Sequence, residues 1–99
     1  MSTFLIASHE SLLNTLRSSV LQSKLPLQSA ALRQPGQALL PLLNGIDSGI
    51  LLMDSTPGQL SEDLTALETW LRSRPQLNVL LFSEDSSKSL LMRAMRAGV

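Results

Sequence analysis

Short apolar runs alternate with amphipathic segments along the 99 residues of the chain. Three runs predict buried strands, because each is continuous, apolar and followed by polar residues. They cover residues 4–7, 49–53 and 77–82, and a weaker strand is predicted over residues 28–32. The intervals between these runs are long enough for helices, so strands and helices are expected to alternate.

Apolar residues recur at helical spacing in the first interval, which predicts a helix over residues 10–22 with Ser8 or Ser11 as its cap. A short helix is expected over residues 38–43, although Pro41 lies within it. A longer helix is predicted to begin at Ser61 as N-cap. Its first turn carries two acidic residues, whose negative charge is stabilised by the helix dipole. The helix is expected to end before a proline.

The last segment of the chain also has helical spacing. A final helix is expected from about Ser87, and Gly98 stands at a usual stop position. Its inward residues would be Leu90, Leu91, Ala94 and Met95.

The order of elements predicts an α/β fold, namely a flavodoxin-like doubly wound parallel sheet that lacks the fifth strand and helix. Residues 1–99 would form a single domain, as the truncated N-terminal part of a longer protein. The strand over residues 77–82 would be left as an open edge. We expect a partner chain, or a continuation of the protein, to cover it.

Composition removes several functional classes. Eight basic and eight acidic residues give a net charge of zero, which argues against a nucleic-acid surface. The absence of cysteine excludes disulfides, cysteine-based zinc sites and thiol nucleophiles. No apolar stretch approaches the ~18 residues that a membrane span needs, and a cytoplasmic location is the default. No cofactor or metal is expected.

Polar residues at the carboxyl ends of the predicted strands are the strongest candidates for function, since ligand chemistry gathers there in parallel sheets. They are Ser8, His9 and Glu10 after the first strand, Asp54 after the third, and Ser83 after the fourth. A lone histidine without cysteines favours a surface or capping role for His9. A Ser–His–Asp hydrolase is disfavoured, because no nucleophile-elbow motif is present.

An aspartate after the third strand and a hydroxyl after the fourth, in this element order, resemble response-regulator receiver domains. The resemblance implies that Asp54 holds the phospho-acceptor position and Ser83 the switch hydroxyl position. The family's acidic pair, which holds Mg²⁺, would fall at Ser8, His9 and Glu10, so that position is degenerate. The family's strand-5 lysine has no counterpart before Val99. The resemblance is therefore to a pseudo-receiver without phosphotransfer, not to an enzyme.

The stretch Leu91-Met92-Arg93-Ala94-Met95-Arg96-Ala97-Gly98-Val99 is similar to the helix-4 exit of TadZ/CpaE-type pilus assembly proteins. In that family a receiver-like domain precedes a ParA/MinD-like ATPase domain and helps to position the tight-adherence pilus machinery. The resemblance implies a protein-interaction and localisation module that is recruited to the cell pole or to the inner-membrane pilus machinery, and it also implies homodimerisation. The expected interaction surface is formed by Leu90, Met92, Arg93, Met95 and Arg96.

Two other functions remain open from the residues. The first is a phospho-accepting receiver that uses Asp54 in signal transduction. The second is a small-molecule or nucleotide-binding α/β domain, although no glycine-rich phosphate loop supports it.

Overall fold

The computed structural model describes the backbone of residues 2–56, 58–84 and 90–96, and side chains as far as residue 82. Five strands form one sheet in the order β2-β1-β3-β4-β5. The strands are β1 (Thr3–Ala7), β2 (Leu27–Leu32), β3 (Gly49–Ser55), β4 (Leu77–Glu84) and β5 (Leu90–Arg96). The helices are α1 (Glu10–Gln22), α2 (Leu40–Leu43) and α3 (Leu60–Leu71).

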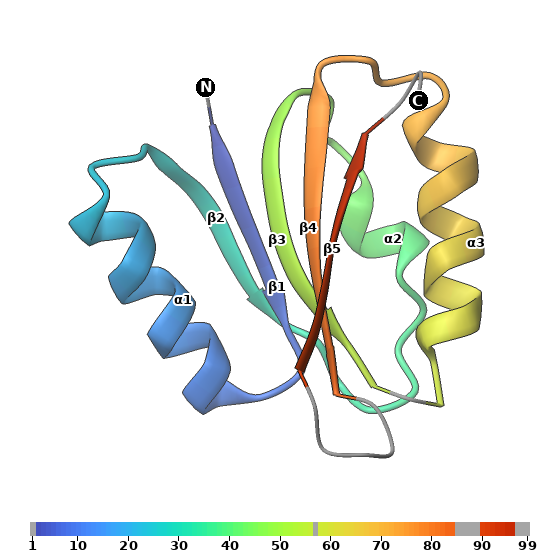
Figure 1. Ribbon diagram of the computed structural model, residues 1–99, viewed down its shortest axis with the longest axis horizontal. Coiled ribbons are helices and arrows are strands. Elements are labelled where there is room, and N and C mark those ends of the chain that lie inside the picture. Colours follow the sequence, from blue (N-terminus) through green and yellow to red (C-terminus); the bar gives the residue numbers. More distant parts are fainter. Residues whose placement is uncertain (1, 57, 85–89, 97–99) are drawn as a thin grey trace.

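The first four strands are parallel, and the helices that connect them lie on both faces of the sheet (Figure 1). This arrangement confirms the predicted α/β class and the flavodoxin-like strand order. Within the described residues there is no fifth parallel strand, as expected. The loops that lead from β1, β2 and β3 into the three helices therefore lie at the same end of the sheet, where the four parallel strands end.

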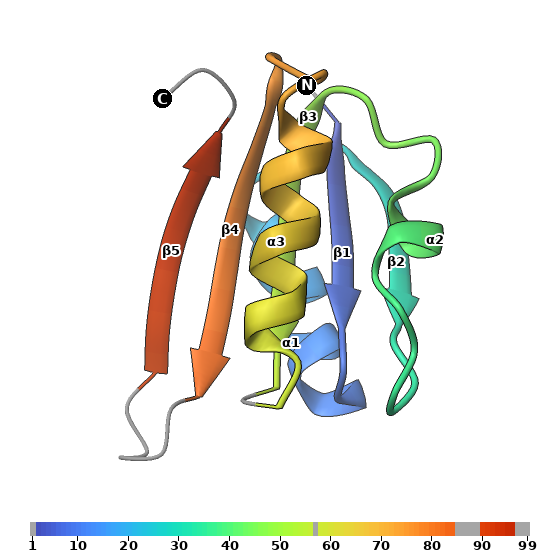
Figure 2. The same ribbon diagram turned by 90° about the vertical axis from the view of Figure 1, so that its right-hand side faces the viewer.

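The last segment differs from the prediction. Residues 90–96 form strand β5, which runs antiparallel to β4, instead of a helix from about Ser87 (Figure 2). The reason is that a short apolar segment satisfies both helical and strand patterns, and an unpaired strand edge favours pairing. The predicted open edge of β4 is therefore covered by the chain's own β5.

Two helix starts also differ from the prediction. Gln59, not Ser61, is the N-cap of α3, and His9, rather than Ser8 or Ser11, is the N-cap of α1. Neither cap residue makes a side-chain capping hydrogen bond. The helix α2 is a single turn with Pro41 near its start, because proline is tolerated only in the first turn of a helix.

The hydrophobic core lies in two layers, one on each face of the sheet. The larger layer joins β1, β3 and β4 to α2 and α3, with Leu51, Leu67 and Leu77 fully buried in it. The smaller layer joins β1 to α1 through Leu5 and Val20. No helix in the described part of the chain is long and apolar enough to cross a membrane.

The face that carries α1 is only partly covered. Strands lie about 4.8 Å apart, whereas one helix is about 10 Å across, so α1 alone cannot cover five strands. Figure 1 shows α1 beside β1 and β2, away from β4. Four apolar side chains on this face of β3 and β4 are accordingly only half-buried: Ile50, Leu52, Leu80 and Phe82.

Candidate functional site

Asp54 lies near the carboxyl end of β3 and is almost enclosed, with 8% of its surface exposed. Both of its carboxylate oxygens accept hydrogen bonds from Ser8, which follows β1 directly. The Ser8 backbone N–H donates to Oδ1 at 2.7 Å, and the Ser8 hydroxyl donates to Oδ2. The parallel pairing of β1 with β3 brings these residues together, although they are 46 positions apart in the sequence. Two of the residues expected at the carboxyl ends of the strands, Ser8 and Asp54, are thus in direct contact.

His9 and Glu10 do not join this contact. Both side chains are exposed, and neither forms an ion pair within the described residues. His9 has extended backbone angles and its carbonyl accepts the first helical hydrogen bond, from Leu13 at 3.0 Å. Glu10 occupies the first turn of α1, where the helix dipole stabilises a negative charge. These two residues therefore serve the start of α1 rather than the carboxylate of Asp54.

The remaining predicted residues are described only as backbone. Ser83 pairs with Ser55 across β4 and β3, while Asp54 pairs with Phe82. The proposed contact residues Leu90, Met92, Arg93, Met95 and Arg96 all fall in β5, so they belong to a strand and not to the expected helix. The side chains of Ser83 and of these five residues lie outside the described part of the structure.

A buried polar network beside Asp54 was not predicted. The Arg33 guanidinium, just beyond β2, donates to both oxygens of Asp63 in α3, at 2.7 and 3.0 Å. Arg33 is 3% exposed and Asp63 2%. The Ser55 hydroxyl donates to the same carboxylate at 2.5 Å, and Arg33 Nε donates to the Gln37 carbonyl at 2.8 Å. Charged and hydroxyl groups therefore satisfy one another at the end of the sheet where the strands finish.

This network connects three parts of the fold at the carboxyl end of the sheet. It ties the loop after β2 to the first turn of α3 and to the last residue of β3. Arg33 and Asp63 are 30 positions apart, so no local pattern in the sequence marks them as partners. Asp63 resembles an ordinary first-turn acid in the sequence, and only the fold shows that it is buried. The consequence is that β3 ends in a fixed position, with its two last polar residues facing opposite layers.

The chemistry available at this edge is limited. Asp54 uses both oxygens to accept hydrogen bonds from Ser8, and Asp63 is neutralised by Arg33. Among the described residues, no three His, Cys, Asp or Glu side chains are grouped as they would be around a metal ion. Phosphoryl transfer to a carboxylate requires that charge on the phosphoryl oxygens be offset by a cation or by positive groups. The hydrogen-bond donors to Asp54 found among the described residues both come from Ser8 and are neutral, and the buried Arg33 is paired with Asp63.

Comparison with known proteins adds no identity. No family model, no curated protein and no solved structure matches this chain. Its function is therefore inferred from its own residues and geometry.

Proposed function

We propose that the chain is a non-catalytic, receiver-like module for protein interaction and localisation in a tight-adherence (type IVb) pilus assembly protein. The observation that carries the proposal is the pairing of Asp54 with Ser8. A carboxylate that accepts hydrogen bonds at both oxygens, and is 8% exposed, is poorly placed to attack a phosphorus atom. The flavodoxin-like strand order supports the resemblance to receivers, while the position of the acidic pair reads Ser8-His9-Glu10, of which Ser8 is the residue bonded to Asp54.

Protein partners are the proposed ligands, and β5 is the proposed contact segment. Among the described strands, β5 lies at one end of the sheet, so its outer edge has no neighbouring strand. An edge strand offers backbone donors and acceptors that a partner can use. The proposed partners are pilus assembly components, including a ParA/MinD-like ATPase domain in the full-length protein.

Incubation with Mg²⁺ and acetyl phosphate tests whether Asp54 is a phospho-acceptor. We expect intact-mass spectrometry to show no added phosphoryl group in the native chain. The variant Ser8→Ala, which removes the hydroxyl donor from Asp54, should also remain unmodified, because no cation site is created. A stable phosphoryl adduct that disappears in Asp54→Asn would replace the proposal with a working receiver.

Binding to the ATPase domain tests the interaction role separately. Isothermal titration calorimetry with a purified ParA/MinD-like domain should detect a complex. The variants Arg93→Glu and Arg96→Glu should weaken it about tenfold or more, because charge reversal at a contact surface replaces attraction with repulsion. Arg17→Glu on α1 is the matched control and should leave the affinity unchanged. If all three variants bind like the native chain, β5 is not the contact segment.

A further inference from the structure

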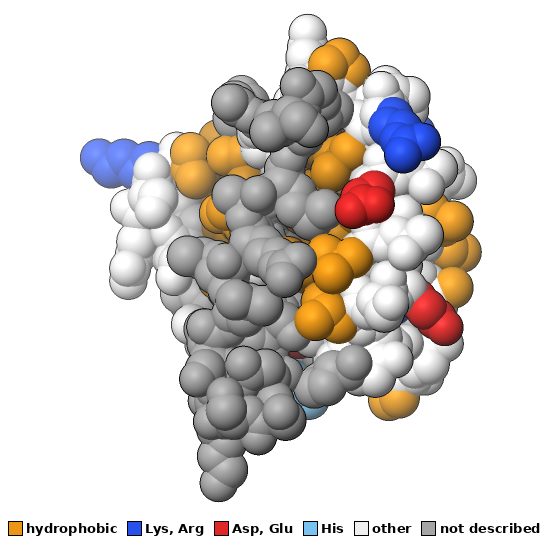
Figure 3. All heavy atoms as spheres, turned by 45° about the vertical axis from the view of Figure 1, so that its right-hand side comes forward, with side chains coloured by type: hydrophobic (Ala, Val, Ile, Leu, Met, Phe, Trp, Pro, Cys, Tyr) orange, Lys and Arg blue, Asp and Glu red, His pale blue; other side chains and the backbone are white. Residues whose placement is uncertain are grey.

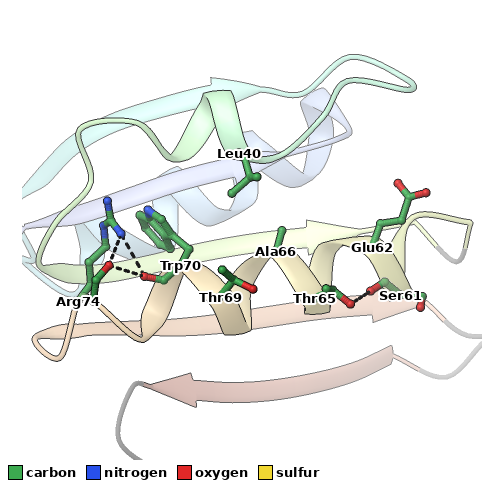
Figure 4. Close-up of a pocket in the computed structure, with 9 residues that line it drawn as sticks. Leu40, Ser61, Glu62, Thr65, Ala66, Thr69, Trp70 and Arg74 are labelled. Carbon is green, nitrogen blue, oxygen red and sulfur yellow. Dashed lines mark hydrogen bonds between the residues drawn. The ribbon is translucent and has the colours of Figure 1, made fainter.

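A groove of about 660 Å³ runs between α2 and α3 on the face opposite α1. Figure 4 shows Leu40 of α2 directed toward α3, with Ala66 and Trp70 facing the same space. The groove exists because α2 is only four residues long and covers little of the adjacent side of α3. The residues that line it are Leu40, Ser61, Glu62, Thr65, Ala66, Thr69, Trp70, Ser73 and Arg74.

The lining is mainly apolar or small, and it carries one charge of each sign. Leu40 is 55% exposed, and its side chain adds apolar surface to the groove. Thr65 and Thr69 expose short side chains along the middle of α3, so another helix can approach closely. Figure 3 shows hydrophobic side chains among uncharged ones on the face turned forward there, with few charged side chains between them.

Glu62 and Arg74 lie at opposite ends of the groove (Figure 4). Glu62 is exposed, and it belongs to neither of the two ion pairs found among the described residues. The Arg74 guanidinium lies 4.7 Å from the centre of the Trp70 ring and donates to the Trp70 carbonyl at 3.1 Å. Arg74 Nε is enclosed without a hydrogen bond in the described structure. It is 3.5 Å from Asp47, a carboxylate whose side chain is 79% exposed and therefore only weakly bound.

We infer that this groove binds a second copy of the same chain, with the two α3 helices antiparallel about a two-fold axis. An antiparallel copy places its Arg74 opposite Glu62, and the symmetry repeats this pair at the other end. That match centres the axis near residue 68. Ala66 then lies opposite position 70 of the second copy, where only 8% of the Trp70 surface is exposed, and the two Thr69 residues lie close to the axis. The exposed surface of Leu40 is covered in both copies.

The contact is small, because α3 has twelve residues and so is about 18 Å long. Interfaces of this size give weak association, and we expect a dissociation constant on the order of 100 µM. This inference does not depend on the proposed function. It uses α3 and not β5, and a failure of either proposal leaves the other standing.

Charge reversal tests the inference with sedimentation equilibrium on the native chain and its variants. Glu62→Arg and Arg74→Glu should each weaken self-association by about tenfold or more, since each creates two like-charge contacts. The double variant Glu62→Arg/Arg74→Glu should restore it. An equimolar mixture of the two single variants should form a heterodimer, because one copy then carries two arginines and the other two glutamates. No partner of a different sequence would produce this pattern.

Glu10→Arg and Arg17→Glu are the matched controls, because they make the same charge changes on exposed residues of α1. Both should associate like the native chain. Far-UV circular dichroism should show that each variant remains folded, because it does not depend on a side chain in the groove. A native chain that stays monomeric up to about 1 mM would overturn the inference. So would single variants that weaken association without recovery in the double variant.

A crosslink provides a second measurement that does not rely on charge. The chain has no cysteine, so Thr69→Cys introduces a single thiol near the proposed axis. Mild oxidation should give a disulfide-linked dimer, since bridged residues must have Cα atoms within about 7 Å. Thr15→Cys, exposed on α1, is the control and should form little dimer. Equal crosslinking of both variants would contradict the placement of the interface on α3.

Discussion

Gly49 is a single residue on which the start of β3 depends. Its φ of +113° lies in a region that side chains rarely adopt, and a Cβ atom there would be 2.1 Å from the Ser2 carbonyl oxygen. The same carbonyl accepts a hydrogen bond from Ile50 at 2.9 Å. The absence of a side chain at residue 49 therefore lets the two parallel strands begin side by side.

Gly49→Ala should destabilise the protein by about 3 kcal/mol or more, because backbone strain and a steric clash add together. Urea unfolding monitored by Trp70 fluorescence measures this loss. Gly45→Ala is the control, since Gly45 has a φ of +87° but a Cβ atom added to it would meet no other atom within 4 Å. It should cost only about 1–2 kcal/mol. Equal losses in the two variants would show that the clash with Ser2 is relieved.

Removal of only one partner of the ion pair between Arg33 and Asp63 should lower the free energy of unfolding strongly. Asp63→Ala leaves a buried guanidinium without its partner, and we expect a loss of about 3–5 kcal/mol in urea unfolding. The double variant Arg33→Met/Asp63→Leu should recover much of this loss, because no buried charge remains. Asp47→Ala, which removes the exposed partner of Arg74, should cost less than about 1 kcal/mol. A small effect of Asp63→Ala would mean that Arg33 can reach water.

At the scale of elements, the sequence predicted three helices and four strands, most distinctly where the apolar pattern is long, as in α1, β3, α3 and β4. The weaker strand predicted over residues 28–32 is present as β2, and the short helix predicted over residues 38–43 is a single turn, α2. The prediction was wrong for residues 90–96, where the apolar spacing fits a helix but a strand forms beside β4. It placed Ser8 and Asp54 at the carboxyl ends of two strands, and their hydrogen bonds follow from the parallel pairing of β1 with β3. It missed Arg33 with Asp63, because burial of an arginine beyond β2 depends on how α3 packs. Long-range packing therefore accounts for what the local patterns leave out.

Amide hydrogen exchange should rank the elements by their neighbours. The strands β1 and β3 lie between other strands, and every residue of β1 is buried, so their amides should exchange most slowly. The single turn α2 has little protection and should exchange at least about a hundredfold faster than β1. Mass spectrometry of peptic peptides resolves these segments. Self-association through the α3 groove would cover α2, so the measurement is made at low protein concentration. Comparable protection of α2 and β1 under those conditions would indicate that α2 is covered in the single chain.

At the scale of the whole molecule, the two faces of the sheet are covered unequally. The helices α2 and α3 enclose one face, whereas α1 alone lies on the other. Parallel sheets are normally covered on both faces. The groove that we assign to a second copy lies beside α3. The uncovered part of the sheet lies on the other face, beside α1. Self-association through α3 therefore leaves the half-buried side chains on β3 and β4 as they are.

Substitutions at two neighbouring residues of β4 test this difference between the two faces of the sheet. Leu81 is 1% exposed beneath α3, whereas Leu80 is half-buried on the face of α1. Leu81→Ala should cost about 3–4 kcal/mol, because the enclosing helix leaves a cavity. Leu80→Ala should cost less than half as much, since part of its side chain already contacts water and no cavity is closed over it. Both substitutions change strand propensity equally. The difference between their free energies of unfolding in urea therefore reports how well each face of β4 is covered by helices. Equal losses would show that the α1 side of β4 is as well packed as the α3 side.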